Sequence, residues 1–158
     1  MTTLREFVET ASRNIDTIFR RTGRIRPMVH CVTRDGDELI FPSTGEDKDT
    51  FALMMRALFE LRDVVRYVMM DEAWMVEAGN DEAVMREAIK HGATASPARV
   101  EIVMFSAEDH AEGQLMAFRK IIRPEGKLPY LDPLQASPDG GMLSGRFVGL
   151  LPRKSTLQ

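Results

Sequence analysis

The chain contains one cysteine, Cys31, in 158 residues, so no disulfide can form within it. This usage is typical of proteins from a reducing compartment. No apolar run approaches the roughly 20 residues that a membrane-spanning helix needs. The N-terminus carries charge from Arg5 onward instead of the apolar stretch of a signal peptide. We therefore expect a cytoplasmic protein without a membrane partner.

Patterns that would identify a reaction are also missing. Neither Ser106 nor Ser144 lies in the G-x-S-x-G setting of a hydrolase nucleophile. Gly140–Gly141 lacks the strand and helix that flank a phosphate-binding turn. The polar turn at 108–112 holds three acids and a histidine, but not in the ligand spacing of a zinc site. The sequence thus predicts no cofactor and no metal.

The charge balance gives little support for a nucleic-acid partner. The net charge is −3, so the field of the whole molecule does not attract a polyanion. A local exception is the arginine-rich end of the first predicted helix, formed by Arg13, Arg20, Arg21, Arg24 and Arg26. These side chains could bind a phosphate or an acidic partner. No aromatic residues are interleaved with them, and a solvated helix end also explains them.

Hydrophobic periodicity predicts three helices. The first begins at a capping box formed by Thr3 and Glu6 and ends before Gly23. The second covers residues 48–62. Its broad apolar face consists of Phe51, Met54, Met55, Leu58, Phe59 and Leu61. A short third helix covers 81–91. Its expected buried face consists of Val84, Met85, Ala88 and Ile89.

Apolar runs rich in β-branched residues predict the strands 27–33, 38–42, 64–76, 99–107 and 114–122. Asp35-Gly36 supplies the positive φ angles of a tight hairpin turn between the first two. Residues 124–145 carry four prolines and four glycines and are predicted to form a long loop. A last edge strand over 146–152 and a flexible tail at 153–158 complete the expected elements.

These elements predict one α+β domain over residues 1–158, built on a mostly antiparallel sheet of five to six strands. The order α-β-β-α-β-(α)-β-β(-β) resembles the profilin-like or roadblock-like arrangement over about residues 3–123. The resemblance lies in element order alone and implies no particular function. Strands 99–107 and 114–122 are apolar on both faces, so both faces of the sheet need cover. With 11 methionines in the chain, self-association as a homodimer is expected.

Few polar residues are placed where chemistry could occur. His30 interrupts an apolar strand and is a candidate general base or ligand, although such a residue usually bonds to one neighbour. Cys31 points to the opposite face, so His30 cannot activate its thiol. Asp71 and Glu72 also point to opposite faces and cannot act as two carboxylates on one substrate. Whichever faces inward is a candidate for a raised pKa, unless a salt bridge holds it. Its expected partners are Arg66, Arg56 or a strand neighbour.

Two functions follow from these observations. The first is a non-catalytic binding or assembly module, in which the sheet face or the 124–145 loop engages a partner. The second is a hydrolase- or isomerase-like enzyme, with His30 and Asp71 or Glu72 lining a pocket under that loop. Trp74 and Tyr130 are the aromatic candidates for contacting a ligand in either case.

Overall fold

The computed structural model describes residues 2–76, 81–92, 97–136 and 149–152. Its helices are α1 (Leu4–Thr22), α2 (Lys48–Leu61) and α3 (Glu82–His91). Its longer strands are β1 (Met28–Thr33), β2 (Glu38–Pro42), β3 (Val64–Val76), β4 (Arg99–Asp109) and β5 (Gly113–Ile122). Two short strands, β6 (Tyr130–Leu131) and β7 (Gln135–Ala136), follow. The predicted α+β class is confirmed.

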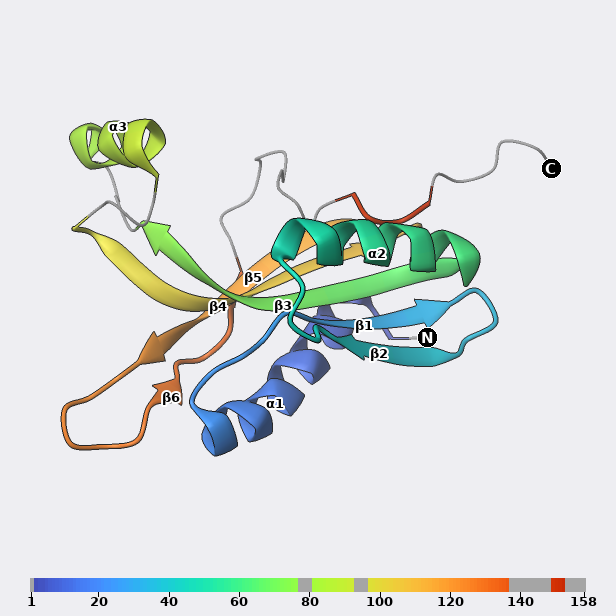
Figure 1. Ribbon diagram of the computed structural model, residues 1–158, viewed down its shortest axis with the longest axis horizontal. Helices are drawn as coiled ribbons and strands as arrows, with labels where there is room; N and C mark the ends of the chain where they lie inside the picture. Colours follow the sequence, from blue (N-terminus) through green and yellow to red (C-terminus); the bar gives the residue numbers. More distant parts are fainter. Residues whose placement is uncertain (1, 77–80, 93–96, 137–148, 153–158) are drawn as a thin grey trace.

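The strands form one antiparallel sheet in the order β2-β1-β3-β4-β5-β6, with β7 also paired to β5. The chain enters β3 from the edge strand β2 through α2, yet β3 pairs with β1. β3 and β4, which are joined through α3, then form a long antiparallel pair. Its register runs from Arg66 opposite Asp109 to Val76 opposite Arg99. Figure 1 shows α1 and α2 on opposite sides of this sheet, with α3 beyond the far end of this pair.

Local signals in the sequence determine where α1 begins and ends. The Thr3 hydroxyl accepts from the Glu6 N–H, and the Glu6 carboxylate accepts from the Thr3 N–H, as in the predicted capping box. Gly23 ends the helix with a φ of +70°, a left-handed conformation that glycine adopts without steric cost. Between these ends, one apolar stripe faces the sheet.

Each helix covers its own apolar core. Under α1 the buried residues include Phe7, Ile15 and Phe19 of the helix with Val68 and Phe105 of the sheet. Under α2 the core lies over β1 and β3. It is formed by Val29, Cys31, Phe51, Ala52, Met55, Phe59, Val64, Tyr67, Met69 and Leu150. Helices thus cover both faces of the sheet at β1 and β3, whereas the expectation of cover on both faces concerned β4 and β5.

Several expectations after residue 80 are wrong. Met85 and Ile89 of α3 are exposed, so the expected buried face of this helix is not formed by them. The side chain of Ala88 lies outside the described residues. The first part of the predicted loop forms β6 and β7, because it pairs with the edge of β5. Residues 149–152 form no strand and instead insert Leu150 into the core under α2. Residues 137–148 and the expected tail at 153–158 lie outside the described residues.

Candidate functional site

His30 lies in β1 on the side of the sheet that α1 covers. Its ring centroid is 4.9 Å from that of Phe7, and its Nε2 is 3.8 Å from Glu38 Oε2. Burial lowers the pKa of His30, and the nearby Glu38 carboxylate opposes this shift only in part. The imidazole is therefore mainly a neutral ring packed on an aromatic side chain, with one carboxylate at its edge.

Asp71 lies on the opposite side of the sheet, under the start of α2. Its Oδ2 is 2.6 Å from Lys48 Nζ, and the carboxylate is almost completely buried. Lys48 also donates to the backbone carbonyl of Glu72, at 3.2 Å. Lys48 was not a predicted partner of this carboxylate; the first turn of α2 brings it to the sheet. The pair ties that turn to the middle of β3.

Glu72 faces α1, on the same side as His30. Its Oε1 accepts from the Ile25 N–H at 2.6 Å, just after the helix ends. Burial raises the pKa of Glu72, and this hydrogen bond partly offsets the shift. His30 is opposite Val68 in the sheet, so Glu72 lies four residues further along β3. At about 3.3 Å per residue this is a separation of roughly 13 Å along the strand.

The three chemical candidates therefore do not meet. Asp71 is on the wrong face for His30, and Glu72 has a different partner at a different position. Burial raises the pKa of the Cys31 thiol to about 11, which keeps it protonated at neutral pH. Within residues 2–76, 81–92, 97–136 and 149–152, no three His, Cys, Asp or Glu side chains are grouped to hold a metal ion.

The polar residues 108–112, at the end of β4 and in the turn after it, make structural contacts instead. Asp109 and Glu112 both pair with the buried Arg66, and Glu112 also accepts from the Leu4 N–H at 3.0 Å. Glu108 accepts from the Tyr67 hydroxyl at 3.2 Å, and His110 Nε2 lies 2.9 Å from the Pro152 carbonyl oxygen. This turn thus joins the start of α1 and the segment 149–152 to the sheet.

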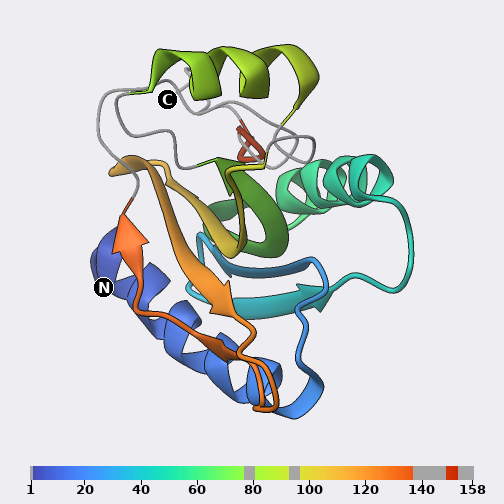
Figure 2. The same ribbon diagram turned by 90° about the vertical axis from the view of Figure 1, so that its left-hand side faces the viewer.

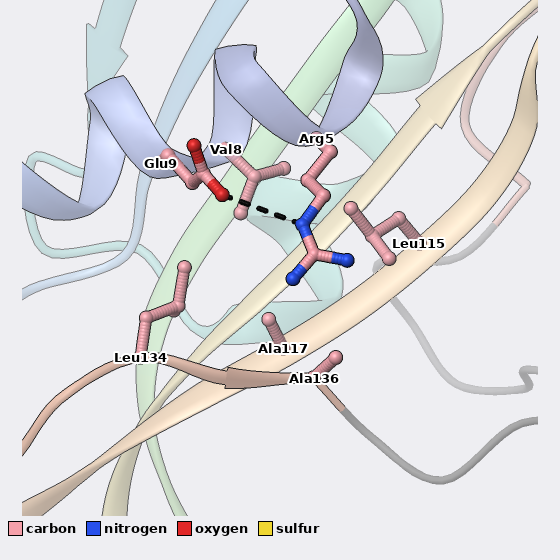
Figure 3. Close-up of a pocket in the computed structure, with 7 residues that line it drawn as sticks. All are labelled: Arg5, Val8, Glu9, Leu115, Ala117, Leu134 and Ala136. Atoms are coloured by element: carbon pink, nitrogen blue, oxygen red, sulfur yellow. Dashed lines mark hydrogen bonds and ion pairs between the residues drawn. The ribbon is translucent and has the colours of Figure 1, made fainter.

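A small hollow lies between α1 and the edge formed by β5 and β7 (Figure 3). Its floor is apolar, and Arg5 and Glu9 of α1 lie beside it, joined by a 3.3 Å ion pair. Its lining consists of Arg5, Val8, Glu9, Leu115, Ala117, Leu134 and Ala136. The volume of about 120 Å³ suits one apolar side chain, because cavities for drug-sized ligands hold about 300–1,000 Å³.

A second, more open hollow continues along α1 and shares Glu9 and Leu134 with the first. Arg119 at its base donates to the carbonyl oxygens of Ser12, Leu131 and Asp132 and pairs with Asp16 at 3.3 Å. These bonds hold the β6–β7 segment against α1. The sequence around Arg119 does not predict these contacts, since an arginine in a strand gives no signal of its distant partners.

The outer side of α2 carries large apolar side chains that nothing in the described residues covers. Leu53 is 67% exposed and Leu61 is 80% exposed, and Met54 is also exposed. Ala57 lies between them, four residues from each leucine. The broad apolar face predicted for this helix is thus two faces, since Phe51, Met55 and Phe59 point into the core. The spacing of Leu53, Ala57 and Leu61 is visible in the sequence, whereas their exposure depends on how the helix packs on the sheet.

The two aromatic candidates lie toward one end of the sheet. Trp74 is near the end of β3 and remains partly exposed, with the Arg99 guanidinium 5.2 Å above its ring. Tyr130 begins β6 and is half exposed. Neither lines the two hollows beside α1.

Wider comparison adds no relative to this description. None of the described helices is long and apolar enough to cross a membrane. No family model matches the chain, and no curated protein or solved structure is significantly similar to it.

Proposed function

We propose that this chain is a non-catalytic binding or assembly module that self-associates through the outer face of α2. The observation that carries the proposal is the exposure of Leu53 and Leu61 on a helix whose other side is already packed on the sheet. Leu53 and Leu61 extend the apolar surface of α2 beyond the face that packs on the sheet, and an exposed apolar patch often marks a contact with another protein. Covering this face would remove the largest exposed apolar side chains of α2 from water.

The arrangement of these residues favours a second copy of the chain as the cover. Leu53 and Leu61 are placed symmetrically about Ala57, so two antiparallel helices centred on Ala57 would bring each leucine against the other leucine of its partner. The small Ala57 side chain would allow close approach at the two-fold axis. The separation from Leu53 to Leu61 is about 12 Å along the helix, or two turns.

Charge supports the same orientation. Asp49 lies in the first turn of α2, and Arg62 caps its end. In an antiparallel pair, the acidic first turn of one copy would lie at the same end as the basic C-cap of the other, and the two helix dipoles would oppose each other favourably. A parallel pair would instead place like ends of the two dipoles together. The antiparallel arrangement is thus complementary to itself in the placement of its leucines and in the direction of its helix dipoles.

The hydrolase- or isomerase-like alternative has less support. That function needs a histidine and a carboxylate directed into one pocket. Asp71 and Glu72 have separate partners, and each hollow beside α1 is lined by other residues. We therefore keep the binding module as the proposed function.

Self-association is tested by measuring the mass of the purified chain in solution, using light scattering after size exclusion. We expect a dimer for the natural sequence and a monomer for Leu61→Glu, because two charges would be buried per dimer. Ile40→Glu is the matched control, since Ile40 is also exposed but lies on the edge strand β2. A natural chain that stays monomeric at high micromolar concentration would refute the proposal.

The two-fold axis has its own test. Ala57→Cys places a thiol where two copies would meet, so mild oxidation should give a covalent dimer. The natural Cys31 is buried and should not cross-link. If the natural chain is a dimer but Ala57→Cys gives no cross-link and Leu61→Glu stays dimeric, another surface mediates the assembly.

A further inference from the structure

Among the described residues, the large exposed apolar side chains outside α2 gather at one end of the molecule, apart from Ile40. They belong to the end of β3, to α3, to the connection from β5 to β6 and to the first residue of β6. They are Trp74, Met85, Ile89, Leu128 and Tyr130. Figure 1 shows these three segments reaching the same end of the molecule, and Figure 2 looks directly onto that end. In Figure 2, α3 lies at the top of this end and the β5–β6 connection at its bottom, with the end of β3 between them.

A chain of contacts joins the parts of this end. Trp74 stacks under Arg99 and is opposite Glu101 in the β3–β4 register. Glu101 pairs with Arg123 at 2.8 Å, and Arg123 reaches the Gly23 carbonyl oxygen at 3.4 Å. The start of the β5–β6 connection is therefore joined to the C-terminal end of α1.

The surroundings of these apolar tips are basic. The contacts above bring the exposed Arg21, Arg24 and Arg26 at the end of α1 next to the connection that carries Lys127. Arg99 adds a further charge beside Trp74. The acids of this part are Glu101, which is paired with Arg123, Glu72, which accepts from the Ile25 N–H, and Glu125 in the connection. α3 carries two acids and two bases (Glu82, Glu87, Arg86 and Lys90), and Asp81 accepts from the Ala83 N–H at its start.

This combination fits a lipid surface better than a nucleic acid. Tryptophan and tyrosine favour the headgroup layer of a bilayer, and arginine and lysine are attracted to anionic headgroups. Leu128, at 83% exposed, has no π-face on which a base could stack. One face of the Trp74 ring is already covered by Arg99. No aromatic residues are interleaved with the arginines in the sequence, because the fold brings the two kinds of side chain to the same end of the molecule.

We propose that this end, formed by the end of β3, α3, the β5–β6 connection and the end of α1, docks on anionic lipid bilayers. Leu128 and Tyr130 enter the headgroup layer, and Arg24, Arg26 and Lys127 lie against the lipid phosphates. The docking is peripheral, because only side chains at the tips of the fold reach the bilayer. It goes beyond the proposed function and uses a surface other than that of α2.

The experiment is co-sedimentation of the full chain with vesicles of phosphatidylcholine alone and of phosphatidylcholine with phosphatidylserine. Trp74 is the one tryptophan of the sequence, so its fluorescence reports directly from this end. We expect binding to the anionic vesicles only, with a blue shift of the Trp74 emission. Raising salt toward 1 M should release the protein, since the screening length falls to about 3 Å.

Matched variants locate the contact. Leu128→Ser should weaken vesicle binding about five- to tenfold, because an inserted leucine is lost. The double variant Arg24→Glu, Arg26→Glu should weaken it by more than roughly twentyfold, since each cation near an anionic membrane contributes roughly fivefold. Ile40→Ser removes an equally exposed apolar side chain elsewhere and should bind as the natural chain does.

Three results would overturn the proposal. The first is the absence of both sedimentation and a Trp74 shift with anionic vesicles. The second is an equal loss of binding in Leu128→Ser and Ile40→Ser, which would indicate nonspecific adsorption. The third is tighter binding to a single-stranded oligonucleotide than to vesicles, with the same dependence on Arg24 and Arg26. None of these results bears on self-association through α2.

Discussion

Arg66 Nε lies 2.7 Å from Asp109 Oδ2, and the two side chains are only 3% and 7% exposed. The residues face each other across the β3–β4 pair, at the end nearest the start of α1. The same guanidinium donates to the Thr2 carbonyl oxygen at 2.7 Å and lies 5.5 Å above the Phe7 ring. One buried cation thus holds together two strands and the first turn of a helix that is distant in sequence.

We expect removal of this cation to be costly. Arg66→Met keeps the length of the side chain but leaves Asp109 buried without its charge partner. Breaking a buried pair in this way typically costs about 3–5 kcal/mol in the free energy of unfolding. Urea denaturation followed by circular dichroism measures this loss in the free energy of unfolding. Arg5→Met is the control, because the Arg5–Glu9 pair is on the surface and should contribute about 0–1 kcal/mol. Similar values for the two variants would contradict the structural role of Arg66.

The same pair predicts a dependence on acid. Burial alone would raise the pKa of Asp109, but the hydrogen bonds from Arg66 and from the Ala111 and Glu112 N–H groups outweigh it and lower the pKa. A carboxyl group whose pKa is lowered on folding contributes stability above about pH 4, and this is lost as the pH falls through the folded pKa. The stability difference between the natural chain and Asp109→Asn should therefore shrink below about pH 4. A difference that stays constant down to pH 2 would show that the charge of Asp109 is not involved.

Local patterns were sufficient to predict the regular elements. The capping box at Thr3 and Glu6, the Asp35-Gly36 turn and the β-branched and aromatic residues of β3 each determine the structure of neighbouring residues. The bounds 64–76 predicted for the long strand are those of β3. Such signals act within a few residues, where propensity and backbone sterics dominate.

Contacts between distant residues could not be predicted in this way. Arg66 and Asp109 are 43 residues apart, and nothing in either segment indicates the other. The pairing of β6 with β5 was also missed, because a two-residue strand at a sheet edge has no periodicity. The split of α2 into a buried and an exposed apolar face depends on the direction from which the sheet approaches. The candidate surfaces are therefore products of the tertiary fold.

His30 should titrate below the usual range for histidine. Burial lowers its pKa from the ordinary value of 6.5, and Glu38 partly opposes the shift. Stability from the neutral ring is thus present above about pH 6.5 and declines as the pH falls toward the folded pKa. Glu38→Gln should lower the pKa of His30 further, which NMR of the ring protons measures directly. Glu87→Gln, beside His91, should leave His30 unchanged. A pKa of His30 at or above 6.5 in the natural chain would contradict its burial.

Leu150 should contribute to stability as a core residue, although it lies in a segment without regular structure. Its side chain is buried with Phe59 and Tyr67 under α2. The segment is also held by Arg56, which donates to the Gly149 carbonyl oxygen at 2.6 Å. Leu150→Ala should therefore cost about 2–5 kcal/mol, as for other buried leucines.

Urea denaturation measures this cost, with Leu128→Ala as the control at an exposed leucine, where we expect a change within about 0.5 kcal/mol. Tyr67→Phe separates the contribution of the Tyr67 hydroxyl from that of the buried apolar side chains. It keeps the ring under α2 but removes the hydroxyl that bonds to Glu108 and to the Leu150 N–H, so it should cost about 0.5–1.5 kcal/mol. If Leu150→Ala is as stable as the natural chain, the segment 149–152 does not complete this core in solution, and α2 alone must exclude water from Tyr67.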